Sequence, residues 1–160
     1  MSVKYKNNIP SSKLSTKKIF FFFTSFILYI LLLMSEMIKY ELEFPIKASP
    51  YMLYQYISSA SSLSEWFADN VNSRGKVFSF FWDGSEEKAE LLSSKNNKFV
   101  KFKWLDNEEN SFFEIKIVVD ELTKDVSLVI TDFSEDDEID EAKMLWESQI
   151  SDLKKVLGSS

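Results

Sequence analysis

Apolar and charged residues alternate from Ile38 onward, and this alternation predicts a strand over residues 38–44. Apolar side chains stand at the even-numbered positions, Ile38, Tyr40, Leu42 and Phe44. The side chains of a strand point alternately to its two faces, so one face of this strand is expected to be buried. Pro45 is expected to close the strand, because proline cannot donate a hydrogen bond to a sheet.

Two short helices are predicted after this strand. Ser49 followed by Pro50 is typical of an N-cap and a first helical residue, and Leu53 and Ile57 then lie on one side of the helix. Residues 62–65 read Ser-Leu-Ser-Glu, which matches a capping box. That match predicts a second short helix carrying Trp66 and Phe67.

Five further strands are predicted over 76–82, 87–93, 99–105, 112–119 and 125–133. Turn-forming residues connect them, namely Asp83-Gly84, Asn96-Asn97, Asp106-Asn107 and Thr123-Lys124. Alternation predicts that the inward side chains are Val100, Phe102, Trp104, Phe113, Ile115, Ile117, Val119, Val126, Leu128 and Ile130. Residues 78–82 are ambiguous, because both faces of that segment carry an aromatic side chain.

A long amphipathic helix is predicted at the end of the chain. Ser134 is the expected N-cap, acidic residues 135–138 favour a helix N-terminus, and Gly158 is the expected end. One apolar stripe repeats every three or four residues through Ile139, Ala142, Trp146, Gln149, Ile150, Leu153 and Leu157. The fold class is therefore α+β, a curved antiparallel sheet of about six strands with two short helices after its first strand, wrapped on a long C-terminal helix.

Residues 1–36 differ from the rest of the chain. They hold five lysines and one glutamate, and residues 19–34 form an apolar run that is broken only by Thr24 and Ser25. At ~1.5 Å per residue this run is slightly short of a ~30 Å hydrocarbon core. Three interpretations stay open: an over-extended gene start, with a cytoplasmic product beginning at Met37; a signal peptide; or a membrane anchor that places the domain outside the cytoplasm. The expected organisation is a leader over 1–36 and a domain over 37–160.

The missing residue types limit the chemistry of the protein. The 160 residues include no Cys and no His, which excludes disulfides, thiolate nucleophiles, imidazole ligands and a histidine base. Carboxylates crowd one predicted hairpin at Asp83, Glu86, Glu87 and Glu90, but nothing marks a pair with different environments. We therefore expect a non-enzymatic protein with no metal and no cofactor.

Charge argues against nucleic acid as a partner. Residues 37–160 hold 14 basic and 24 acidic side chains, without the basic stripe that phosphate contacts need. The local lysine cluster of Lys95, Lys98, Lys101, Lys103 and Lys116 alternates with Glu114 on the predicted outer face of the sheet. Seven carboxylates over residues 132–141 lack the spacing of a calcium loop, and a solvated helix cap explains them better.

Three segments resemble the START-like domains of the SRPBCC superfamily, and most closely its branch of Aha-type activators of heat-shock-protein ATPases. They are Ala48-Ser49-Pro50 with Leu53-Tyr54-Gln55-Tyr56-Ile57-Ser58, then Leu63-Ser64-Glu65-Trp66-Phe67-Ala68, and finally Trp146, Ile150 and Leu153-Lys154-Lys155-Val156-Leu157. The resemblance implies the helix-grip fold, whose sheet and terminal helix can enclose a cavity. Many relatives have six strands after the paired helices, whereas five are predicted here, which implies a smaller interior.

The resemblance and the inward-facing residues together indicate a binding site between the sheet and the terminal helix. Its expected lining is Tyr40, Trp82, Phe102, Trp104, Phe113, Ile115, Leu128, Ile130, Trp146 and Ile150. An apolar small molecule or lipid is the expected partner, unless these rings fill the interior as a solid core. The alternative function is an interaction module whose partner is a chaperone ATPase. An enzyme of the cyclase or hydrolase type is a weaker alternative. A membrane is an expected partner only if residues 19–34 are an anchor.

Overall fold

The computed structural model describes Thr24, residues 37–105 and residues 111–158. All of its strands and labelled helices belong to one compact unit, residues 36–160. The elements follow the order β1 (Met37–Pro45), α2 (Pro50–Ser58), α3 (Ala60–Leu63), β2 (Asn70–Arg74), β3 (Val77–Trp82), β4 (Ser85–Lys95), β5 (Phe99–Trp104), β6 (Phe112–Val119), β7 (Val126–Glu135) and α4 (Ile139–Val156).

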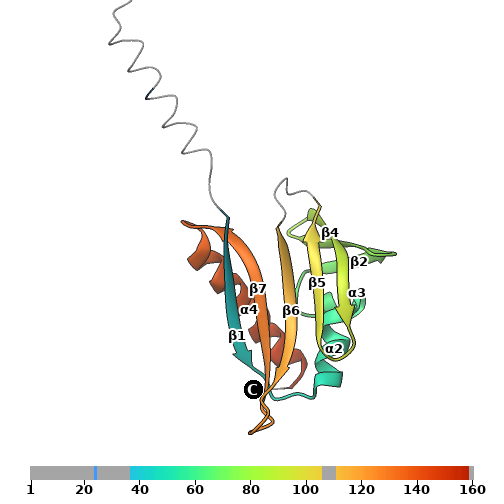
Figure 1. The fold of residues 1–160 in the computed structure, drawn as a ribbon. Helices are drawn as coiled ribbons and strands as arrows, with labels where there is room; N and C mark the ends of the chain where they lie inside the picture. Colours follow the sequence, from blue (N-terminus) through green and yellow to red (C-terminus); the bar gives the residue numbers. More distant parts are fainter. Residues whose placement is uncertain (1–23, 25–36, 106–110, 159–160) are drawn as a thin grey trace, which may run out of the picture. The chain divides into compact units, whose positions relative to one another are not determined.

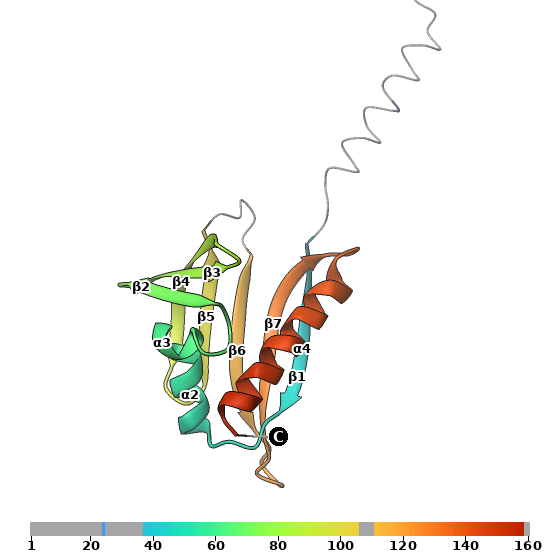
Figure 2. The same cartoon turned by 180° about the vertical axis from the view of Figure 1, so that it is seen from behind.

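The strands form one antiparallel sheet in the order β1-β7-β6-β5-β4-β3-β2. The first and last strands of the chain are therefore neighbours, with Leu42 opposite Ile130. Helices α2, α3 and α4 all lie on the same face of this sheet (Figure 1, Figure 2). The α+β architecture with a long C-terminal helix is confirmed.

The turns and caps explain why the hairpins close where they do. Asp83 and Gly84 both have positive φ, 48° and 82°, as a two-residue hairpin turn requires, and Asn97 also has a positive φ of 58°. The Ser49 side chain caps α2 by accepting a hydrogen bond of 3.2 Å from the Met52 N–H. Gly158, at φ 67°, ends the last helix as predicted. The predicted turn at Asp106-Asn107 lies outside the described residues.

The structure contains one strand that the pattern did not predict. Strand β2 pairs with β3 at the edge of the sheet, which gives six strands after the paired helices instead of five. Its sequence, Asn-Val-Asn-Ser-Arg, offers a single apolar residue, Val71, and only that side chain is buried. A five-residue edge strand with one buried position is too short to show a period of two.

Two predicted helix starts are wrong. Ser134 does not cap the last helix, because β7 continues through it to Glu135 and the Ser134 side chain is buried opposite Ile38. Glu138 holds the N-cap position instead, without a side-chain hydrogen bond. The second short helix likewise begins one turn earlier than the capping box predicts. Its cap is Ser59, which accepts from the Ser62 N–H at 3.2 Å.

The predicted inward face is confirmed at most positions. Phe102, Ile115, Leu128 and Ile130 are fully buried, and Trp146, Gln149, Ile150 and Leu153 are the buried residues of α4. Phe78 and Phe80 resolve the ambiguous segment, because both are buried and Phe81 is not. Val119 is the exception, since its side chain at the end of β6 stays 42% exposed. The core therefore lies between the sheet and the three helices.

Candidate functional site

The structure brings the ten predicted lining residues together on the helix-covered side of the sheet. Eight of them are buried, and Trp82 and Trp104 are partly buried against the same cluster. They come from β1, β3, β5, β6, β7 and α4, so every layer of the domain contributes to this interior. Sequence reasoning therefore located the residues, whereas their role as a ligand cavity stays a prediction.

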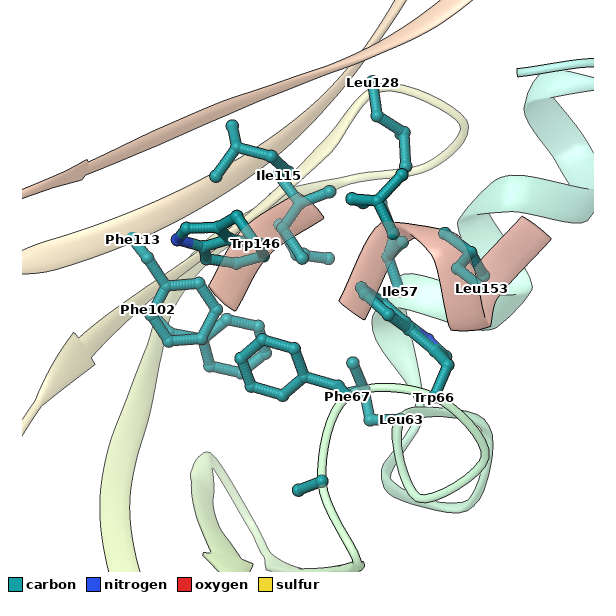
Figure 3. Close-up of a cluster of buried hydrophobic side chains, with 14 of the residues drawn as sticks. Ile57, Leu63, Trp66, Phe67, Phe102, Phe113, Ile115, Leu128, Trp146 and Leu153 are labelled. Atoms are coloured by element: carbon teal, nitrogen blue, oxygen red, sulfur yellow. The ribbon is translucent and has the colours of Figure 1, made fainter. Parts of the chain in front are cut away.

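Aromatic rings contact one another through the middle of this interior (Figure 3). The centroid of the Phe113 ring lies 5.0 Å from the ring centroids of Phe102 and Trp104, and 6.0 Å from that of Trp146. Aromatic contacts at such distances contribute to stability beyond the area that they bury. A ligand that enters the interior must therefore move at least one of these rings.

Phe67 is a central residue that the sequence analysis did not assign to the site. Its ring lies 5.6 Å from Phe113, 5.5 Å from Trp146 and 5.8 Å from Trp82 between centroids. The residue lies in the turn after α3 and not on a helix, so no periodic pattern marked its direction. Its position in the Trp-Phe-Ala segment shared with START-like domains was the available signal.

Asp132 is a second residue whose role the sequence analysis missed. It was expected to be one of several solvated carboxylates, but it is partly buried beneath the last helix. Its Oδ2 accepts hydrogen bonds from Trp146 Nε1 at 2.8 Å and from the Tyr40 hydroxyl at 3.3 Å, and its Oδ1 accepts from the Phe133 N–H. These donors provide polar contacts at one end of an otherwise apolar interior.

This carboxyl group and its neighbour titrate outside their ordinary ranges. Burial raises the pKa of Asp132, and the hydrogen bonds from Trp146, Phe133 and Tyr40 oppose that rise without cancelling it. Burial also raises the pKa of the Tyr40 hydroxyl, with the charge of Asp132 as the next cause. Tyr40 is therefore a neutral hydrogen-bond donor throughout the physiological pH range.

A hollow of about 490 Å³ opens between the turn at residues 64–69 and the last helix. We call it the α4 hollow, and its walls are residues 64–69 and Trp82 on one side and Leu145, Ser148, Gln149, Asp152, Lys155 and Val156 on the other. Phe67 and Trp82 belong both to these walls and to the aromatic cluster. The α4 hollow thus borders the predicted ligand site.

Hydrogen bonds fix the turn that forms one wall of the α4 hollow. The Phe67 carbonyl accepts from Trp82 Nε1 at 3.1 Å and from Gln149 Nε2 at 3.0 Å. The neighbouring Trp66 donates through Nε1 to the Tyr56 carbonyl at 3.0 Å. The turn is therefore bonded to the sheet, to α4 and to α2.

A larger hollow of about 890 Å³ lies at the C-terminal end of β1, beside the β6–β7 connection. Charged residues including Glu43, Lys47, Asp120 and Lys124 line it, and none of the ten predicted residues does. Backbone N–H groups of Thr123 and Leu122 hold the pKa of Asp120 below its ordinary value. These bonds give Asp120 a role in closing its own turn.

The carboxylates considered for catalysis belong to the β3–β4 hairpin, where Glu87 lies opposite Phe80 and Glu90 opposite Val77. Asp83, Glu86 and Glu87 are exposed at the β3–β4 hairpin, and Glu86 is bridged to Lys88 at 3.6 Å. Within the part of the chain that the structure describes, no three metal-ligating side chains are grouped to hold an ion. No helix among those residues is long and apolar enough to span a membrane, and the run at 19–34 lies outside them except for Thr24.

The lysines predicted on the outer face include Lys101 and Lys103 on β5 and Lys116 on β6. Lys101 Nζ lies 3.6 Å from the centroid of the Phe112 ring, and Phe112 contacts Phe133 edge-to-face at 4.9 Å. These two phenylalanines lie two residues beyond the Glu114–Thr131 pair of the β6–β7 register. Aromatic and cationic side chains thus share the face of the sheet opposite to helices α2, α3 and α4.

Comparison with known proteins places this geometry in a family. The family described as START-like superfamily domain matches residues 34–159. No curated protein matches the chain. Among solved structures, the Bacteroides fragilis protein BfR322 is 38% identical, with a TM-score of 0.55 over 76% of this chain and 92% of that one.

Two more distant structures share the fold. The Aha1 dimer from Colwellia psychrerythraea is 18% identical, with a TM-score of 0.65 over 75% of this chain and 96% of that one. Protein MLL2253 from Mesorhizobium loti is also 18% identical, with a TM-score of 0.63 over 76% and 97%. With the match over residues 34–159, the seven-stranded sheet and the helix lying across it, the chain belongs to the START-like superfamily.

Proposed function

We propose that this START-like domain binds a small hydrophobic ligand between its sheet and helix α4, without catalysing a reaction. The observation that carries the proposal is the α4 hollow, because two of its wall residues, Phe67 and Trp82, are also members of the aromatic cluster. Ligand sites are typically concave and apolar with a few polar groups. The interior has this composition, and the walls of the α4 hollow combine aromatic and aliphatic side chains with polar and charged ones.

The path of the ligand follows from the ring contacts. A molecule in the α4 hollow meets Phe67 first, and displacement of that ring exposes Phe113 and Trp146, which it contacts at 5.6 and 5.5 Å. Asp132, Tyr40 and Trp146 then supply polar contacts at the far end. We infer that Phe67 acts as the movable residue between the hollow and the predicted lining.

Dye binding to the full chain tests this proposal. The neutral dye N-phenyl-1-naphthylamine is titrated, and its fluorescence is expected to rise to saturation. Ser148→Trp fills the α4 hollow from an exposed position of α4, and Ser151→Trp is the matched control outside it. The first variant should weaken dye binding by about tenfold or more, and the control should change it by about twofold or less.

Both variants keep the whole chain, so dye bound elsewhere contributes equally to each titration. Equal affinities in Ser148→Trp, Ser151→Trp and the unmodified protein would contradict binding at the α4 hollow. Absence of saturable dye binding would contradict the ligand-binding function itself.

A second candidate function rests on the outer face of the sheet. Phe112 contacts both Lys101 and Phe133 on the face opposite to helices α2, α3 and α4, and the fold is similar to that of the Aha1 dimer. If the domain proves not to bind a hydrophobic ligand, we propose instead that this face of the sheet contacts a chaperone ATPase. The test measures the ATP hydrolysis rate of a heat-shock-protein ATPase with the chain added, and Lys101→Glu should abolish any stimulation that Lys154→Glu leaves unchanged.

A further inference from the structure

We propose that the ligand of the α4 hollow carries a positive charge, as an organic ammonium group attached to an apolar body. This inference rests on the proposed function and names the class of ligand for the same site. Three features of the walls support it: several hydrogen-bond donors are already used, the Trp82 ring is partly exposed there, and carboxylates outnumber ammonium groups.

Several side-chain donors around the α4 hollow already donate within the protein. Trp82 Nε1 and Gln149 Nε2 both donate to the Phe67 carbonyl, at 3.1 and 3.0 Å, and Trp66 Nε1 donates to the Tyr56 carbonyl. Lys155 Nζ lies 2.7 Å from Asp152 Oδ1. Lys155 keeps further N–H bonds for a ligand, but the Asp152 carboxylate beside it offsets its charge, which weakens its attraction for a carboxylate or phosphate.

The aromatic walls favour the opposite charge. The indole N–H group of Trp82 donates to the Phe67 carbonyl, so this side chain can meet a ligand only through its ring. Trp82 is also partly exposed at the hollow, and the largely buried Phe67 ring lies 5.8 Å from it. An ammonium group near the face of a tryptophan is attracted by the ring quadrupole, and this attraction increases when water is excluded.

Carboxylates stand on both sides of the hollow. Glu65 and Asp69 belong to the turn, and Asp152 belongs to the facing helix. Lys155 is the one basic residue of these walls, and its contact with Asp152 neutralises one of the three acids. The remaining charge is negative, so a cation entering the hollow is attracted and an anion is repelled.

Competition between matched amphiphiles tests the charge of the ligand. The full chain is loaded with N-phenyl-1-naphthylamine, which is then displaced by n-decylamine, 1-decanol or sodium decanoate, each below its micelle concentration. The three probes share a ten-carbon chain and differ in charge. Decylamine should displace the dye at a concentration about tenfold or more below that of decanoate, with decanol between them.

Charge variants then locate the effect. Glu65→Gln combined with Asp152→Asn removes two carboxylates from the walls, and Glu141→Gln combined with Glu147→Gln removes two exposed carboxylates of α4 that do not line the hollow. The first pair should reduce the preference for decylamine to about threefold or less, because the attraction falls with the wall charge. The control pair should keep the preference.

The possible results separate this inference from the function on which it rests. If the dye binds but decanoate competes as well as decylamine, the ligand charge is wrong and the hydrophobic site stands. The same holds if the control pair lowers the preference as much as the wall pair does. If no dye binds, both the site and the inference are overturned.

Discussion

The surroundings of Asp132 set it apart from the acidic residues that follow it in the sequence. Those residues are mostly exposed near the start of α4, whereas Asp132 accepts hydrogen bonds from Trp146, Tyr40 and the Phe133 N–H. These hydrogen bonds stabilise the ionised form of Asp132, but burial destabilises that form more and therefore raises the pKa of Asp132. Trp146 is therefore both a core residue and a polar partner.

Replacement of Trp146 should show this double role. We expect Trp146→Ala to lower the free energy of unfolding by about 3–5 kcal/mol, because it leaves a cavity under α4, and to remove the 2.8 Å hydrogen bond to Asp132. Urea denaturation followed by circular dichroism measures the change. Glu147→Ala, at the exposed neighbouring position, should change it by less than about 0.5 kcal/mol. Equal losses would mean that Trp146 is not in the core.

The raised pKa of Asp132 predicts a pH dependence with a definite sign. The folded protein holds this proton more tightly than the unfolded chain, so stability falls as pH rises from the ordinary carboxyl pKa near 4 to the raised folded-state value. Asp132→Asn cannot titrate, so its stability relative to the unmodified protein should increase over that window and then stay level. Urea unfolding at pH values from 3.5 to 8 measures this difference, and parallel profiles would contradict it.

At the scale of elements, the predictions from the sequence succeeded where a repeated pattern is long enough to read. Eighteen residues of α4 and the alternating strands β5, β6 and β7 gave their buried faces directly. Strand β2 was not predicted, because its single buried residue, Val71, makes no alternating pattern. The prediction of Ser134 as an N-cap was wrong, because a serine before acidic residues is typical of a cap. Only its pairing with Ile38 shows that β7 continues through it.

The candidate site followed the same division. Residues on regular elements, such as Phe113 and Trp146, were assigned correctly to the interior, since their parity fixes their direction. Phe67 and the walls of the α4 hollow were not, because an irregular turn has no period. The position of this turn depends on long-range hydrogen bonds, such as the one from Gln149 to the Phe67 carbonyl, which joins residues 82 positions apart in the sequence.

A cap variant tests the start of α2. Ser49→Ala removes the side-chain oxygen that accepts from the Met52 N–H, and it should lower the free energy of unfolding by about 0.5–2 kcal/mol. Gln55→Ala changes an exposed position of the same helix and should alter stability by less than about 0.5 kcal/mol. Thermal and urea melts of both variants measure the difference. Equal small effects would show that the cap contributes nothing.

At the scale of the whole domain, the two faces of the sheet have different environments. The helices bury the face that carries Phe102, Phe113 and Ile115, whereas Phe112 and Phe133 remain partly buried on the other face. Phe112→Ser should therefore cost less stability than Phe113→Ser. We expect a difference of about 2 kcal/mol or more in urea unfolding, since Phe113 is 1% exposed. A reversed order would mean that the covered face is misassigned.

The pairing of β1 with β7 has a consequence for how the protein is made. Phe44 lies opposite Leu128 and Met37 opposite Glu135, so the first strand finds its neighbour only after more than eighty intervening residues are synthesised. Contacts between such distant segments slow folding, because a long loop must close before they form. On the ribosome, β1 must wait with Ile38, Tyr40 and Leu42 unpaired until β7 has left the exit tunnel. We therefore expect the pairing of β1 with β7 to be a late step in the assembly of this sheet.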